Sequence, residues 1–176
     1  KYLPIKENII IITGPASGAG KMGFALSQIY RERKKKIYTG FAKFETFPIW
    51  NLPLNHPINL AYESATADLG DINMFDPFHW KAYKKKAVNY NRDIENFKIL
   101  LTITKKITKE KWPCGYRSPT DMGVNMAKIG IINDKICQKA SINEIKRRYE
   151  IYKKEFQKGR EGERTILRMK EILKKI

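Results

Sequence analysis

The stretch NIIIITGPASGAGK, residues 8–21, decides the expected fold of this chain. Residues 8–13 form a continuous apolar run, which is typical of a parallel strand covered on both faces. Turn-forming residues follow, and apolar residues then recur at helical spacing over residues 22–33. A second strand-like segment covers residues 37–44. Strand, glycine-rich turn, helix and strand together predict a βαβ unit, and therefore an α/β fold with a parallel sheet.

The glycine-rich turn carries the clearest chemical signal. Such a turn exposes backbone N–H groups at the start of a helix, where these donors and the helix dipole favour a phosphate. The turn departs from the P-loop pattern G-x-x-x-x-G-K-[ST], because Pro15 stands at the first glycine and Met22 replaces the hydroxyl that holds magnesium. We expect phosphate binding with little need for Mg²⁺, and a purely structural turn is the alternative. The residues expected to contact phosphate are Gly14, Ser17, Gly18, Gly20 and Lys21.

Two polar residues after the second expected strand are placed to share the ligand's crevice. In open α/β sheets, ligands bind beyond the carboxyl ends of the strands. Glu45 and Thr46 lie at such an end, as does the turn before Lys21. A carboxylate there can act as a base or a metal ligand, and the alternative is a solvated strand end. The sequence therefore places Glu45 among the catalytic candidates.

The rest of the chain consists of a proline-punctuated aromatic loop and a mostly helical region. The loop covers residues 46–79 and includes a short helix over about residues 59–69. Apolar residues at helical spacing predict further helices over residues 94–107, 141–158 and 163–176.

We therefore expect two subdomains, a P-loop-like α/β part over residues 1–79 and an appended, mostly helical part over residues 80–176. Ser141 and Glu144 fit a capping box at the start of one helix. The apolar stripes of the last two helices have no evident partner in the sequence. We expect these stripes to be exposed and the helices to fray.

Composition excludes several classes of protein. The chain has 176 residues with 42% hydrophobic and 30% charged side chains, which excludes a disordered or low-complexity chain. No apolar run approaches the ~20 residues needed to span a bilayer. Cys114 and Cys137 do not suggest a disulfide framework or a zinc site. We expect a reduced, cytoplasmic protein with no metal site and no membrane partner.

The chain is strongly basic, with a formal net charge of +17. Most of the excess lies in residues 81–176, and lysine greatly outnumbers arginine. Arginine and stacking aromatic residues are the stronger signature of nucleic-acid binding. The distribution therefore favours solvated lysine faces, and a surface for nucleic acid or an acidic partner is the alternative.

Several other polar residues have a functional and a structural interpretation. His56 and His79 lie beside prolines in loops or near a helix start, where they either contact a ligand or form structural hydrogen bonds. Asn91 and Asp121 lie where helix caps are expected. The catalytic candidates are Lys21, Glu45 and His56, and the candidates for substrate binding are Thr46, Asn51, Glu63, Asp68, Asn91 and Asp121.

Long motifs in this sequence closely resemble a bacterial protein family. They include AKFETFPIWNLPL at residues 42–54, ATADL at 65–69, VNYNRD at 88–93 and SPTDMGVN at 118–125. Over residues 9–149 the chain resembles domain-of-unknown-function family 1846. The resemblance implies a middle segment of a protein of about 500 residues, which is the length of several domains. It implies no established activity.

Some family members carry a protease label, which this sequence does not support. It has no H-E-x-x-H motif and no visible Ser/His/Asp or Cys/His arrangement. We expect an enzyme-like domain that binds a phosphorylated small molecule or a nucleotide. The alternative is a non-catalytic module that binds nucleic acid or an acidic partner through its basic helical half. The other expected partners are the remaining N- and C-terminal parts of the same protein.

Overall fold

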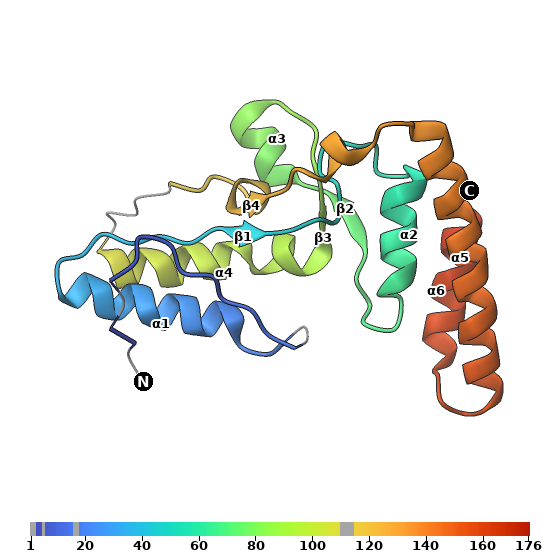
Figure 1. Ribbon diagram of the computed structural model, residues 1–176, viewed down its shortest axis with the longest axis horizontal. Helices are drawn as coiled ribbons and strands as arrows, with labels where there is room; N and C mark the ends of the chain where they lie inside the picture. Colours follow the sequence, from blue (N-terminus) through green and yellow to red (C-terminus); the bar gives the residue numbers. More distant parts are fainter. Residues whose placement is uncertain (1–2, 5, 16–17, 110–114) are drawn as a thin grey trace. The chain divides into compact units, whose positions relative to one another are not determined.

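The computed structural model describes residues 3–4, 6–15, 18–109 and 115–176 (Figure 1). It is a mixed α/β structure in which helices dominate and the strands are short. The helices are α1 (Lys21–Lys34), α2 (Pro57–Ala65), α3 (Pro77–Tyr83), α4 (Asn91–Thr108), α5 (Asp134–Gln157) and α6 (Glu163–Leu173). The strands are β1 (Lys43–Phe44), β2 (Asn73–Phe75), β3 (Val88–Tyr90) and β4 (Gly123–Val124), and the short 3-10 helices are η1 (Thr120–Met122) and η2 (Ala127–Gly130).

The chain folds as two compact units, each built from segments that are distant in the sequence. Unit 1 consists of residues 1–42 and 97–115, and unit 2 consists of residues 43–96 and 116–176. Unit 1 contains α1, whereas unit 2 contains both small sheets together with α2, α3, α5 and α6. The two subdomains expected from the sequence each contribute residues to both units.

In unit 1, α1 confirms the helix expected from the apolar spacing. Its buried residues are Ile29, Gln28 and Glu32, and Gln28 Nε2 donates a hydrogen bond to Glu32 Oε1 (3.2 Å). Basic residues occupy the last turn, where they complement the helix dipole. The Arg33 guanidinium in that turn donates to the backbone carbonyl of Thr108 (2.7 Å). This bond joins the C-terminal ends of α1 and α4.

The strand expected over residues 8–13 is not formed in the described part of the chain. Ile9 and Ile11 are 81% and 83% exposed, and no described strand pairs with this segment. The strand expected over residues 37–44 is reduced to β1 at its last two residues. An apolar run becomes a parallel strand only where neighbouring strands satisfy its backbone groups and both faces are covered. The βαβ unit expected from these two segments is therefore wrong.

The strands of unit 2 form two separate pairs. β1 pairs with β4 in parallel, so that Phe44 lies opposite Val124, and this pair is the small parallel sheet of the fold. β2 pairs with β3 in antiparallel fashion, with Met74 opposite Asn89. A parallel sheet was expected, but the partner of β1 is a strand some eighty residues later in the chain. Local periodicity does not reveal a pairing at that separation.

The hydrophobic core of unit 2 lies among α2, α5 and α6, which pack side by side (Figure 1). Leu60 of α2, Ile145 of α5 and both Met169 and Ile172 of α6 are fully buried in one cluster. The expectation that the apolar stripes of the last two helices are exposed is therefore wrong. Their partner is α2, a short helix more than seventy residues earlier.

The start of α5 also differs from the expectation. Ser141 lies inside the helix and does not begin it. The N-cap is Asn133, whose side chain accepts a hydrogen bond from the backbone amide of Ile136 (3.2 Å). Asparagine is as good an N-cap as serine. The first turn of α5 is rich in polar residues, so apolar spacing does not reveal where the helix begins.

We expect Ile145→Val to lower the free energy of unfolding by about 1 kcal/mol, because deleting one buried methylene removes apolar contacts in a packed core. Ile151→Val on the same helix is the matched control, because Ile151 is exposed and its substitution removes little packing. Urea unfolding followed by circular dichroism measures both variants. Equal effects would mean that the stripe of α5 is not buried in solution.

Candidate functional site

The described part of the glycine-rich turn has the backbone conformation of a helix start without a side-chain cap. Gly18 and Gly20 have positive φ angles of 79° and 86°, which favour glycine. Gly20 is the N-cap of α1, and a glycine has no side chain with which to cap the helix. No acidic residue lies in the first turn of the helix. Gly20 therefore leaves the first backbone amides of α1 without a side-chain cap of its own. Ser17, which is also expected to contact phosphate, lies outside the described residues.

The side chain of Lys21 folds back over the turn. A Cβ atom at Gly14 would come within 3.2 Å of Lys21 Cγ, so the absence of a side chain at Gly14 allows this approach. Lys21 makes further interactions within the protein. The structure thus brings Gly14 and Lys21 together, and all the described phosphate candidates belong to unit 1. The other catalytic and substrate-binding candidates belong to unit 2.

In unit 2, Glu45 belongs to a half-buried cluster of ionisable side chains. Lys43 Nζ contacts Glu45 Oε1 (2.9 Å) and also pairs with the carboxylate of Asp93. The hydroxyl of Tyr90 donates to the same Glu45 oxygen (2.7 Å). One oxygen of Glu45 is thus held by a cation and a phenol at once. Sequence analysis singled out Glu45 but missed Lys43 and Tyr90.

The cluster fixes the protonation of its members. Burial lowers the pKa of Lys43, but the Glu45 and Asp93 carboxylates outweigh it and hold that pKa above its usual value. Burial, together with the charges of Glu45 and Asp93, raises the pKa of Tyr90 well above its usual range. At neutral pH, Lys43 is a cation and Tyr90 is a neutral phenol that donates to a carboxylate.

A small recess beside Glu45 is lined by polar and apolar side chains. Its volume is about 10 Å³, enough for one water molecule. A Cβ atom added at Gly123 would lie 3.5 Å from Glu45 Oε2, so this oxygen faces the glycine. The residues around the recess are Glu45, Pro48, Trp50, Val88, Asn89, Thr120, Gly123 and Asn125.

His56 has a structural role at the start of α2. Its Nδ1 accepts a hydrogen bond from the backbone amide of Ile58 (3.3 Å), which caps the helix. Its Nε2 lies 3.1 Å from Asp134 Oδ1 at the start of α5. Because Nδ1 is an acceptor, the neutral ring carries its proton on Nε2 and donates it to Asp134. The ring therefore links the N-termini of two packed helices.

Glu63 is fully buried beneath α6. Its carboxylate pairs with the Arg168 guanidinium, lies 3.5 Å from Lys175 Nζ, and accepts the backbone amide of Asn73 (2.9 Å). Because these partners lie on or next to α6 and on β2, the buried carboxylate joins α2 to both elements.

The other candidates for substrate binding lie on separate parts of unit 2. Thr46, Asn51 and Asp68 are exposed. Asn91 Oδ1 accepts the backbone amide of Ile72 (3.0 Å), which fixes the turn before β2. Asp121 accepts hydrogen bonds from the backbone amides of the two residues before Pro119 and from the hydroxyl of Tyr83 (2.8 Å). These bonds hold the loop before η1 in place.

Ser118, His79 and Asp121 lie together, although no pattern in the sequence predicts it. The Ser118 hydroxyl is 2.9 Å from His79 Nδ1, and Asp121 Oδ1 is 3.6 Å from the same nitrogen. A catalytic triad needs the serine and the aspartate on opposite ring nitrogens. Ser118 is also fully buried, so it cannot reach a substrate. This group is therefore a structural network.

We expect the stability of unit 2 to fall as the pH rises from about 10 to about 12. Burial, and then the Asp68 carboxylate that accepts the Tyr152 hydroxyl (3.3 Å), raises the pKa of Tyr152 from 10.0 to about 12. The unfolded chain loses this proton first, so the stabilisation is complete below pH 10 and lost as the pH passes the folded-state value. Urea unfolding at several alkaline pH values measures the slope. Tyr152→Phe should reduce the slope, while Tyr90, whose pKa is also raised, maintains the rest of it. An unchanged slope would contradict the assignment.

Two findings on the described residues concern metal ligands and membrane-spanning helices. No group of three or more histidine, cysteine or acidic residues there is arranged to hold a metal ion. None of the described helices is long and apolar enough to cross a membrane.

Comparison of the sequence with known proteins identifies the family to which this α/β domain belongs. The sequence-family model described as "Domain of unknown function DUF1846, N-terminal" matches residues 1–176. The chain therefore belongs to this family. This confirms the resemblance found in the motifs.

Its relatives are much longer proteins. The chain is 51% identical over 172 residues to the UPF0371 protein of Clostridium tetani (strain Massachusetts / E88), covering 98% of the chain and 34% of that protein. It is 53% identical over 149 residues to the UPF0371 protein of Corynebacterium glutamicum (strain R), covering 85% and 30%. The chain therefore spans about a third of the length of these relatives.

Proposed function

We propose that this domain binds a phosphorylated small molecule or a nucleotide at the glycine-rich turn, as part of an enzyme-like protein. The observation that carries the proposal is the start of α1. There, an N-cap glycine without a side-chain cap precedes a fourteen-residue helix with no acidic residue in its first turn. Backbone amides at such a helix start and the helix dipole favour an anion. Lys21, which folds back toward Gly14, adds a compact positive charge.

The proposed acid–base groups lie in unit 2. Glu45 is the stronger candidate, because Lys43 and Tyr90 engage Oε1 while Oε2 faces the recess beside Gly123. A carboxylate held in this way keeps one oxygen available as an acceptor for a proton or a hydroxyl group. His56 is the weaker candidate, because both of its ring nitrogens already have partners.

We expect Lys21→Ala to weaken the binding of pyrophosphate or ATP to the full-length protein about tenfold, because a charge-assisted hydrogen bond contributes roughly 1.5–3 kcal/mol. Lys34→Ala removes the same charge from the other end of α1 and is the matched control. Isothermal titration calorimetry measures both variants. Unchanged affinity in Lys21→Ala, or an equal loss in both variants, would overturn the proposal.

The same titration, repeated with EDTA in place of Mg²⁺, tests whether binding needs magnesium. Because Met22 stands where a P-loop has its magnesium-binding hydroxyl, binding should change little when EDTA replaces Mg²⁺. Loss of binding in EDTA would place a metal at another residue, such as Glu45.

The alternative function, nucleic-acid binding through the basic helical half, has less support. Some of the basic side chains on α5 and at its C-cap pair with acidic neighbours on the helix. Arg147 and Arg148 both pair with Glu144 (2.7 and 2.8 Å), and Lys158 pairs with Glu155 (2.8 Å). These pairs reduce the positive charge offered to a phosphate backbone. A sequence-independent affinity for DNA that falls steeply with salt would favour this alternative.

A further inference from the structure

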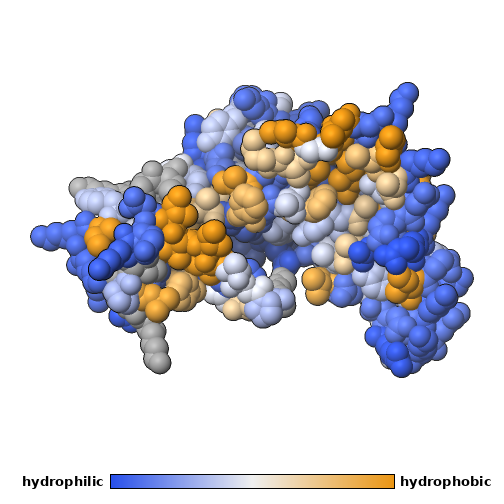
Figure 2. All heavy atoms as spheres, in the orientation of Figure 1, coloured by the Kyte–Doolittle hydropathy of each residue, from blue (hydrophilic) through white to orange (hydrophobic). Residues whose placement is uncertain are grey.

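An apolar strip lies on one face of unit 2 along β1, β4 and η2. We call it the β4 strip and define it by Phe44, Val124, Met126 and Ile129. These side chains are 85%, 44%, 63% and 73% exposed. Figure 2 shows apolar side chains gathered over β4 and the segment that leads from it to α5. Exposed apolar side chains that lie near one another mark interaction sites more often than scattered exposed residues do.

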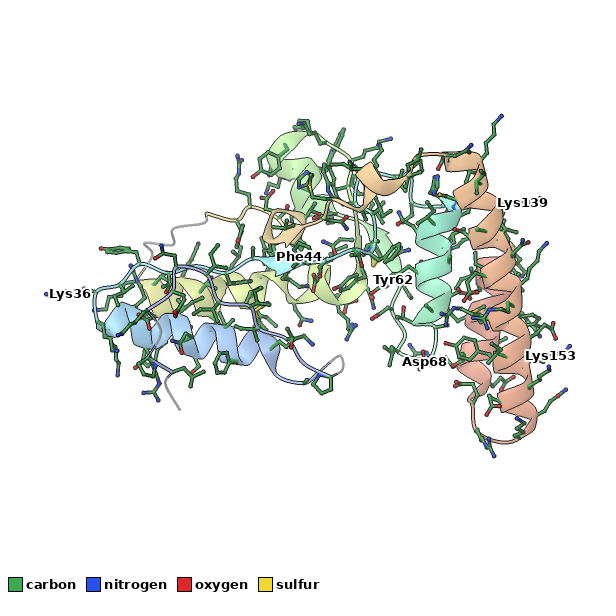
Figure 3. The ribbon with its side chains drawn as sticks, in the orientation of Figure 1. Lys36, Phe44, Tyr62, Asp68, Lys139 and Lys153 are labelled. Carbon is green, nitrogen blue, oxygen red and sulfur yellow. The ribbon has the colours of Figure 1, made fainter. Side chains whose placement is uncertain are left out.

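Two members of the strip, Phe44 and Val124, lie on one face of the parallel sheet. Phe44 and Val124 are register partners, so their side chains lie on the same side of the β1–β4 pair. Lys43 and Glu45 flank Phe44 in sequence and therefore point to the opposite side, where they form the cluster with Tyr90. One face of the sheet is thus covered by the protein and the other is open, as the exposed Phe44 labelled in Figure 3 indicates. Parallel sheets are normally covered on both faces.

The strip is held in place before any partner binds. Asn125 Nδ2 donates to the backbone carbonyl of Pro48 (2.9 Å), and its Oδ1 accepts the backbone amide of Ala127 (3.1 Å). The amide of Ile129 donates to the carbonyl of Met126 (3.0 Å), which closes the turn. A surface that is already ordered loses little conformational entropy on association.

We propose that the β4 strip is the docking face for the part of the full-length protein that lies outside these 176 residues. The chain covers only 34% of its Clostridium tetani relative, and the family model that matches it is the N-terminal one. Full-length members therefore contain further polypeptide in the same molecule, at a high effective concentration. The chemistry of the strip calls for a partner surface of aliphatic and aromatic side chains. The one charged side chain of η2, Lys128, donates to the backbone carbonyl of Asn51 (3.2 Å).

Photo-crosslinking of the full-length protein tests this inference. A p-benzoylphenylalanine residue placed at position 129 should form crosslinks to peptides from outside the 176 residues. The same residue at position 167 is the matched control, because Leu167 is an exposed apolar residue on α6, away from the strip. Mixing isotope-labelled and unlabelled protein separates crosslinks within one molecule from those between copies. Crosslinks to unit 1, to a second copy, or to nothing would each overturn the proposal.

A substitution provides an independent measurement. Ile129→Lys should accelerate amide exchange about tenfold in the docked region of the full-length protein, because a charge in an apolar contact favours its opening. Leu167→Lys should leave exchange in that region unchanged. Because Ile129 is exposed in unit 2, the substitution removes no packing within the unit itself. Equal exchange in the two variants would overturn the proposal. Neither readout depends on the phosphate site, so the two proposals fail separately.

Discussion

Glu63→Ala should lower the free energy of unfolding of unit 2 by about 3–5 kcal/mol, because removing one partner of a buried ion pair leaves the other partner's charge uncompensated. The Glu63 carboxylate is fully buried and is engaged by Arg168, by Lys175 and by the amide of Asn73. Its loss would leave the Arg168 guanidinium with only the exposed Glu171 as an acidic partner and the amide of Asn73 without its acceptor. That cost exceeds the loss of the methylene contacts.

The matched control is Glu171→Ala, which removes the other carboxylate that contacts Arg168. Glu171 is exposed on α6, and its pair with Arg168 (2.6 Å) is a surface contact. Such a pair contributes about 0.5 kcal/mol or less, so this variant should unfold almost like the original chain. Urea unfolding of both variants at one pH gives the comparison. Equal small losses would mean that the interior ion pair does not hold α6 on α2.

This contrast also shows why sequence analysis assigned Glu63 to substrate binding. On the sequence, Glu63 belongs to a polar face of a short helix in an aromatic loop, which is where ligand contacts are common. Its partner Arg168 is 105 residues away, at a separation that no local pattern reaches. The structural interpretation of His56 depends on an equally distant partner, because its ring bonds to Asp134. Buried polar residues that hold distant elements together look like site residues until their partners are known.

The helices could be predicted, whereas the pairing of strands could not. Apolar spacing found α1 and α6 close to their observed bounds, because helical periodicity is a local property. The apolar run at residues 8–13 has the composition of a strand but lacks a strand partner in the described structure. β4 is only two residues long and contains a glycine, so it has no recognisable strand pattern. β4 is a strand only because it pairs with β1, about eighty residues earlier in the chain.

The sequence singles out the glycine-rich turn and Glu45 as candidates, but the groups that contact Glu45 could not be predicted from it. The glycines and Lys21 form one continuous motif in the sequence. Lys43 and Tyr90 belong to motifs almost fifty residues apart, and only the fold brings them onto the same carboxylate oxygen. Predicting a residue type at a strand end is thus easier than predicting its protonation, which depends on burial and on neighbouring charges.

Asp76→Ala should destabilise unit 2 by about 3 kcal/mol or more, because the lost helix cap contributes about 0.5–2 kcal/mol and each unsatisfied buried donor about 1–3 kcal/mol. The Asp76 carboxylate is fully buried. Oδ1 accepts the backbone amides of Phe78 and His79 (2.9 and 3.0 Å) at the start of α3. Oδ2 accepts both the amide and the hydroxyl of Thr120 (3.2 and 2.6 Å), which fixes η1 and therefore the approach to β4.

Two further variants separate these contributions. Asn133→Ala removes an exposed cap with a single hydrogen bond to Ile136 and should cost about 1 kcal/mol or less. Asp76→Asn keeps a carbonyl oxygen for the amides of α3 but turns an amide donor toward the two donors of Thr120, so most of the loss should remain. Urea unfolding measures the three variants, and amide exchange at Thr120 reports the local effect. If Asp76→Asn were as stable as the original chain, the bonds to Thr120 would contribute little, and the capping of α3 alone would account for the buried aspartate.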